Sequence, residues 1–86
     1  MYSLSIEKSE ESRLVQLAQK GDTNALDTLL RANYDRIFSI CRKVAGNDAD
    51  ADDATQEALC SIVRNISSFK GESRFSTWAY RVATNA

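Results

Sequence analysis

The sequence predicts an all-α fold, a compact bundle of three to four helices. Apolar residues recur at helical spacing along most of the chain, proline is absent, and only three glycines occur among 86 residues. Turn-dense β-sandwiches depend on proline and glycine, so this composition argues against them. A chain of this length buries only about 60% of the surface that its unfolded form exposes, so we expect one small, marginally stable domain.

The first predicted helix follows an N-terminal tail. We expect residues 1–10 to be a flexible tail and residues 11–86 to form the domain. Ser9 is a candidate N-cap, because acidic residues that complement the helix dipole follow it. Gly21 can end this helix in the left-handed conformation. Its apolar stripe consists of Leu14, Val15, Leu17 and Ala18.

The second and third predicted helices are the longest. The second spans residues 24–45, with Asp22 or Thr23 as its cap and Gly46 as its stop. The third spans residues 51–66. Their apolar stripes contain Leu26, Leu29, Leu30, Asn33, Tyr34, Ile37, Cys41, Val44, Ala54, Ala58, Leu59, Ile62, Val63 and Ile66.

The last predicted helix follows a loop at residues 67–73, which is rich in serine and glycine. It begins near Ser73 or Arg74, and its pattern continues to Ala86, so we expect the domain to be part of a longer chain. Phe75, Trp78, Ala79, Val82 and Ala83 recur at the spacing of a core-facing stripe.

Composition excludes several classes of function. There is no histidine, so imidazole catalysis is excluded and metal binding is unfavourable. Two cysteines are too few for a disulfide framework and fit a reducing cytoplasm. No apolar run is long enough for a membrane span, and the N-terminus lacks the features of a secretory signal. We expect no enzyme activity, no catalytic residues and no cofactor.

Acidic residues gather before and along the third predicted helix. The spacing at residues 48–52 resembles a calcium loop, but Asp53 stands where glycine is required and Leu59 where glutamate is required. Asp48 and Asp50 are better explained as helix caps. Asp53, Gln56 and Glu57 then form a polar ridge, which is either a solvated face or a docking site for an arginine-rich partner helix.

Aromatic and basic residues gather near the C-terminus. Residues 61–86 carry four Lys or Arg against one acid, whereas residues 1–60 carry seven against eleven. Basic side chains neutralise phosphates and aromatic rings stack on bases, so this composition suits single-stranded nucleic acid. Phe69, Lys70, Arg74 and Arg81 are candidate contacts. Phe69 could equally be a plug that packs the loop onto the domain.

Two motifs in this sequence resemble region 2 of the sigma-70 family, in its extracytoplasmic function group. They are Asp-Ala-Thr-Gln-Glu at residues 53–57 and Phe-Ser-Thr-Trp-Ala-Tyr-Arg-Val-Ala-Thr-Asn at residues 75–85. The upstream Leu-Ala-Gln-Lys-Gly-Asp at residues 17–22 also fits, so the resemblance extends over nearly the whole chain.

The resemblance implies a cytoplasmic bacterial protein with two binding surfaces. The ridge, with Asp50, would dock onto the β′ clamp helices of core RNA polymerase. The loop would hold a flipped base of the non-template minus-ten strand, and an anti-sigma factor would cover these faces. The implied DNA-binding residues are Phe69, Lys70, Gly71, Glu72, Ser73, Arg74, Arg81 and Asn85; the implied polymerase-binding residues are Asp50, Asp53, Gln56 and Glu57.

Two alternatives remain open. One is a helical protein-interaction module whose loop is structural and which binds no DNA. The other is a thiol-based sensor that uses Cys60. The family's second DNA-binding domain does not occur in this sequence, and Asn85 is the penultimate residue, which would weaken its contact with DNA.

Overall fold

The computed structural model describes residues 7–85, and these form four α-helices and one short 3-10 helix. The elements are α1 (Lys8–Gln19), α2 (Thr23–Ala45), α3 (Asp48–Asn65), η1 (Ile66–Ser68) and α4 (Phe75–Asn85). No strand occurs among these residues, so the all-α prediction is confirmed. None of the helices within this range combines the length and the apolar character needed to cross a membrane.

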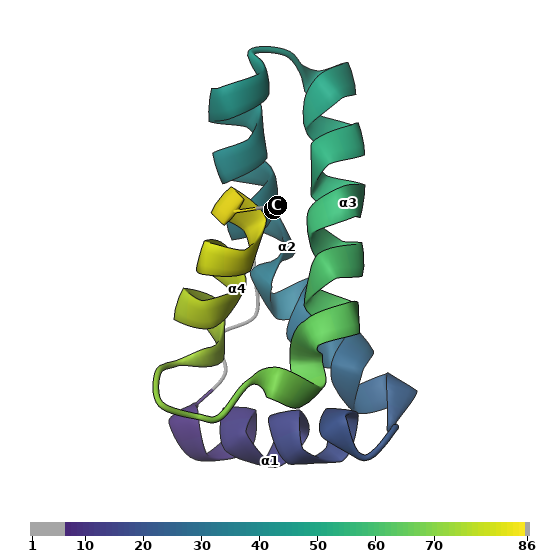
Figure 1. The fold of residues 1–86 in the computed structure, drawn as a ribbon, viewed down its shortest axis with the longest axis vertical. Helices are drawn as coiled ribbons and strands as arrows, with labels where there is room; N and C mark the ends of the chain where they lie inside the picture. The colour runs from purple at the N-terminus through teal and green to yellow at the C-terminus, as the bar shows by residue number, and fades with distance from the viewer. Residues whose placement is uncertain (1–6, 86) are drawn as a thin grey trace.

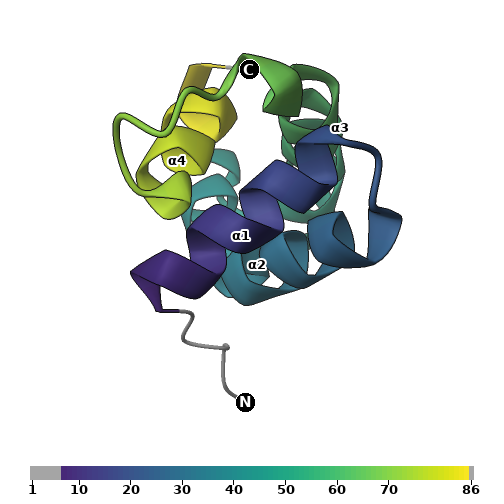
Figure 2. The same cartoon turned by 90° about the horizontal axis from the view of Figure 1, so that it is seen from below.

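The helices α2 and α3 form a long antiparallel hairpin, and the shorter α4 packs beside its lower half (Figure 1). The first helix, α1, runs across the lower end of this bundle, as the view from below shows (Figure 2). In both views the connection between η1 and α4 lies beside α1. The loop before α4 and the first helix therefore lie at the same end of the molecule, whereas α4 ends near its middle (Figure 1).

The ends of α2 are set by local sequence. The carboxylate of Asp22 accepts hydrogen bonds from the backbone N–H groups of Asn24 and Ala25, at 3.0 and 3.1 Å. Gly46 has a φ of 86°, a left-handed conformation that costs glycine little and other residues more. Both sequence predictions are confirmed. Gly21 also has a positive φ after α1, as predicted.

Helix α2 begins one residue earlier than predicted, and α3 and α1 differ more. The third starts at Asp48, because the side chain of Asn47 accepts the N–H of Asp50 at 2.9 Å and is itself the N-cap. Asp48 and Asp50 therefore lie in the first turn, where they complement the helix dipole without capping it. The first helix starts at Lys8, with Glu7 at the N-cap position, so Ser9 is not the cap. Residues 1–6 of the predicted tail lie outside the described residues.

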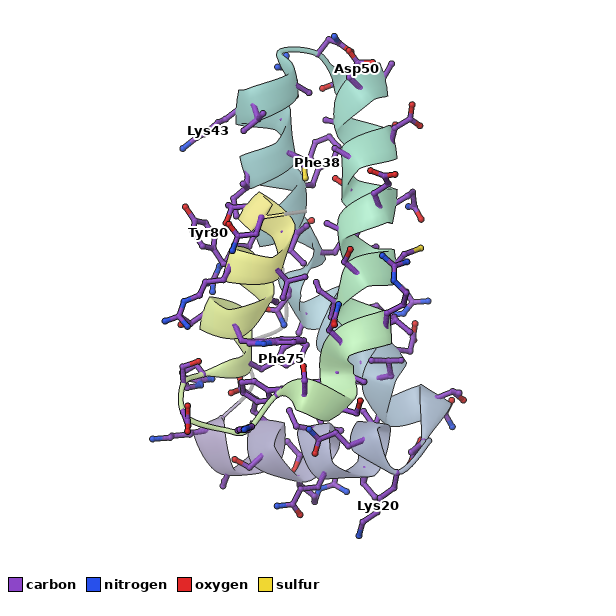
Figure 3. All side chains as sticks on the ribbon, in the orientation of Figure 1. Lys20, Phe38, Lys43, Asp50, Phe75 and Tyr80 are labelled. Carbon is purple, nitrogen blue, oxygen red and sulfur yellow. The ribbon has the colours of Figure 1, made fainter. Side chains whose placement is uncertain are left out.

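The core lies between α2, α3 and α4 and is closed below by α1. Its fully buried large side chains include Leu29, Ile37, Ile62 and Phe75, all from the predicted stripes. Figure 3 shows Phe38 and Phe75 directed inward. Val44 is 85% exposed because α4 ends lower down and leaves the last turn of α2 partly uncovered (Figure 1). Its assignment to the core stripe is wrong.

Val63 is also more exposed than its predicted stripe position implies, at 41%. Its neighbour Ile62 occupies the buried position, and consecutive side chains on a helix point about 100° apart.

A more unusual core residue is Thr55, which is fully buried. Its hydroxyl has no hydrogen-bond partner. An unsatisfied buried hydroxyl costs free energy that a methyl group of similar shape does not.

Thr55→Val is therefore expected to raise the free energy of unfolding by about 1 kcal/mol, because it replaces the unpaired hydroxyl with a methyl group. Urea unfolding followed by circular dichroism measures the change. Thr55→Ser is the matched control: it keeps the hydroxyl, removes the methyl group and is expected to lower stability. Lower stability of the valine variant would show that the hydroxyl has a partner in solution.

Candidate functional site

The loop at residues 69–74 is held at both ends by two side chains of α1. At the start of the loop, the Nε2 group of Gln19 donates to the carbonyl oxygens of Ile66 and Phe69, at 2.9 and 2.8 Å. At its end, the carboxylate of Glu11 accepts the backbone N–H of Phe75 at 2.9 Å. The same carboxylate accepts two hydrogen bonds from the guanidinium of Arg74, both at 3.0 Å.

Glu11 is thus the N-terminal cap of α4, contributed by a distant helix. Only 7% of Glu11 is exposed. Burial acts to raise the pKa of its carboxyl group, but the hydrogen bonds from Arg74 and Phe75 outweigh burial and lower this pKa below its ordinary value of 4.5. The cap also explains why α4 begins at Phe75, slightly later than predicted.

The aromatic residues of the loop and α4 form one cluster. The ring of Phe69 lies 5.9 Å from that of Phe75 and 5.2 Å from that of Trp78, measured between ring centroids. Phe69 is only 8% exposed. Of the two interpretations of Phe69, the structure therefore supports the plug that packs the loop onto the domain. Phe75 and Trp78 pack into or against the core, as predicted.

A depression of about 180 Å³ separates α1 from the loop. Five of the predicted DNA-binding residues line it on the loop side: Phe69, Lys70, Gly71, Ser73 and Arg74. The side formed by α1 includes Lys8, Ser12 and Gln16. The lining thus carries three cationic side chains and one carboxylate, and that carboxylate is paired with Arg74. The depression is consequently positive, with Val15 and Phe69 as its apolar lining residues.

The other predicted DNA-binding residues lie apart from this depression. Glu72 is exposed in the loop, and Arg81 and Asn85 are exposed on α4. Asn85 is ten residues beyond Phe75, which places it about 15 Å further along the helix axis. The structure therefore does not bring Asn85 to the loop, and the two cannot contact the same base within this depression.

Glu11 and Gln19, which position the loop, are not among the residues predicted from the sequence. The sequence pattern places Glu11 only among the acidic residues of a first turn. A signal was present, because Glu11 precedes Leu14, Val15 and Ala18 at i+3, i+4 and i+7. Glu11 therefore lies on the buried face of α1, where a carboxylate needs a partner.

The acidic ridge is exposed, as predicted. Asp53, Gln56 and Glu57 lie on the face of α3 opposite its buried stripe, which consists of Ala51, Thr55, Ala58 and Ile62. Asp50 is also exposed, and its carboxylate accepts a hydrogen bond from the Nδ2 group of Asn47 at 3.0 Å. Gln56 and Glu57 line a shallow depression on α3 together with Cys60, Ser61 and Arg64.

Two further features concern the thiols and the acidic side chains of the described residues. Cys41 is buried and Cys60 is exposed, and both are free thiols. Between residues 7 and 85, no group of three or more Cys, Asp or Glu side chains is placed to hold a metal ion.

Glu11→Gln is expected to lower the free energy of unfolding by about 1–3 kcal/mol at neutral pH, because it removes the charge from a buried hydrogen-bond acceptor. The pKa of Glu11 is lower in the folded chain than its ordinary value of 4.5. The Glu11 carboxylate therefore contributes fully to the free energy of unfolding above pH 4.5. This contribution is lost as the pH falls through the lowered pKa. Urea unfolding at neutral and acidic pH should show the difference between wild type and variant shrinking on acidification.

Glu10→Gln is the matched control for this measurement. Glu10 pairs with Arg13 on the surface of the same helix, where solvent screens the interaction. Its replacement is expected to change stability much less. Equal effects of the two substitutions would contradict the role of Glu11 as the residue that holds the loop.

Comparison with known proteins identifies the family to which this chain is similar. Residues 29–86 match the model of Sigma-70 region 2. The chain is 38% identical over 71 residues to the ECF RNA polymerase sigma factor SigW of Bacillus subtilis, covering 83% of this chain and 38% of that protein. It is 34% identical over 79 residues to the ECF RNA polymerase sigma-E factor of Escherichia coli, covering 92% and 41%.

The RNA polymerase sigma-H factor of Pseudomonas aeruginosa is 32% identical over 78 residues, which cover 91% of this chain and 40% of that protein. The chain thus spans about two fifths of the length of these relatives. No solved structure matches it significantly. The match covers both the ridge on α3 and the loop that α1 holds, so this chain belongs to the Sigma-70 region 2 family, within its extracytoplasmic function group.

Proposed function

We propose that this chain is the promoter-recognition and promoter-melting domain of an alternative sigma factor in the bacterial cytoplasm, and that it acts in transcription initiation by binding alone. The observation that carries the proposal is the loop at residues 69–74, fixed at both ends beside a positive depression. Family membership and the curated relatives, which are named RNA polymerase sigma factors, support it.

The depression suits one unstacked base of the non-template minus-ten strand. A cavity of about 150 Å³ accommodates benzene, so about 180 Å³ is the size for one base ring system and little more. Extruding a base from a duplex costs a few kcal/mol, and a loop that is already ordered adds no further ordering cost. Lys70 and Arg74 would attract the phosphates on either side of the base.

The exposed residues of α4 would contact a different part of the strand. Arg81 would bind the sugar-phosphate backbone, and Asn85 would recognise a base edge about 15 Å from the loop. The strand would then run from the depression along the outer face of α4. This arrangement modifies the expectation that Asn85 and the loop share one base.

The ridge on α3 would dock onto the β′ clamp helices of core RNA polymerase. Asp50, Asp53 and Glu57 are carboxylates that can accept charge-assisted hydrogen bonds from arginines of a partner helix, and Gln56 can both donate and accept. All four residues are exposed. An anti-sigma factor that covers the ridge or the loop would prevent either contact.

Lys70→Ala is expected to weaken the binding of short single-stranded DNA and to reduce the slope of log K against log salt concentration by about 0.7, the contribution of one phosphate contact. NMR titration of the isotope-labelled chain at several salt concentrations measures both. Lys43→Ala is the matched control, because Lys43 lies far from the loop (Figure 3). Lack of binding by the folded wild-type chain would favour a protein-interaction module that binds no DNA.

Asp53→Ala/Gln56→Ala is expected to weaken binding to a β′ clamp-helix fragment markedly, with little change in folding stability, because both side chains are exposed. Calorimetric titration measures the affinity. Asp35→Ala is the control, since Asp35 is an exposed carboxylate on α2, outside the ridge. Equal affinities for the double variant and wild type would place the polymerase contact elsewhere.

A further inference from the structure

Two neighbouring rows of side chains on α1 line the depression, and they make different contacts. Glu11, Val15 and Gln19 recur at intervals of four residues and form an inner row, of which Glu11 and Gln19 bind the loop directly. Lys8, Ser12 and Gln16 recur at the same interval and form an adjacent outer row. Both rows line the depression. The outer row is exposed, whereas Glu11 and Val15 are buried.

In the described part of the chain the side chains of the outer row make no hydrogen bond to the loop, although the charge of Lys8 helps to lower the pKa of the nearby Glu11 carboxyl group. Within residues 7–85, no carboxylate forms an ion pair with Lys8, and neither Ser12 nor Gln16 makes a hydrogen bond through its side chain. By contrast, four of the arginines in this range have a carboxylate partner. The outer row therefore presents one ammonium group, one hydroxyl and one amide to whatever enters the depression.

We propose that α1 is the second wall of the strand-binding site, opposite the loop. Lys8 binds a phosphate of the single strand, and Gln16 forms hydrogen bonds with the edge of the base in the depression. This inference rests on the proposed function, in which the loop binds the same strand. It extends the proposed DNA-binding surface to α1, a helix with none of the predicted contact residues.

The chemistry of the two side chains fits these tasks. The ammonium of Lys8 stands on a flexible stem and can reach a phosphate without a fixed geometry. The amide of Gln16 offers both donors and an acceptor, as recognition of a base edge requires. The inner row fixes the spacing between α1 and the loop, so the two walls can contact one nucleotide at the same time.

The test is a set of single substitutions in the full 86-residue chain, titrated with a random-sequence pool of single strands of about ten nucleotides. Lys8→Ala is expected to weaken binding and to lower the salt slope by about 0.7. Gln16→Ala is expected to weaken binding with the salt slope unchanged, because it removes no charge. NMR titration suits both, since it detects weak binding and shows whether each variant is folded.

Lys20→Ala is the matched control for Lys8→Ala. Both remove one positive charge from α1 or its end, but Lys20 points away from the bundle at the opposite end of the helix (Figure 3). A salt slope for Lys8→Ala equal to that for Lys20→Ala would overturn the phosphate contact. Wild-type affinity of Gln16→Ala would overturn the base contact.

A parallel titration of Lys70→Ala separates this inference from the function on which it rests. If Lys70→Ala weakens binding while Lys8→Ala and Gln16→Ala do not, the loop binds the strand and α1 does not. If neither the wild-type chain nor any variant binds single-stranded DNA, the proposed function is wrong, and so is the inference that α1 contacts the strand.

Discussion

The carboxylate of Glu11 is the constraint on which the arrangement of α1, the loop and α4 depends. It joins the first turn of one helix to the first residue of another across 64 positions of sequence. A buried carboxylate is tolerated only when its lone pairs are satisfied, and here a backbone N–H and a guanidinium satisfy them. Because the same group caps α4, the start of that helix and the position of α1 are fixed together.

This constraint lets one small domain present two separate surfaces of opposite charge. The hairpin of α2 and α3 presents the acidic ridge along one side, while α1 and the loop enclose a positive depression at its lower end (Figure 1). The opposite charges of the two surfaces would each repel the partner of the other. An arginine-rich helix and a nucleic acid strand could then be bound at once without competing.

Helix positions and caps could be predicted from the sequence because they depend on residues close together in the chain. Asp22 and Gly46 act within one turn of their own positions, and the apolar stripes need only helical periodicity. Val44 could not be placed, because its exposure depends on where α4 ends in space. The task of Glu11 was missed for the same reason, since its partners belong to the last helix of the described chain.

The sequence leaves two roles open for the ring of Phe69: packing the loop onto the domain or stacking on a base. The free energies of burial and of stacking help to choose between them. Moving this ring out to stack on a base would forfeit about 1.5–3 kcal/mol of burial. Stacking on a base returns about 1–3 kcal/mol, so the exchange yields no net free energy. Stacking therefore offers the ring no gain for leaving its contacts with Phe75 and Trp78. In the proposed function, charge and hydrogen bonding from Lys70 and its neighbours, rather than stacking by Phe69, would therefore dominate the affinity for a strand.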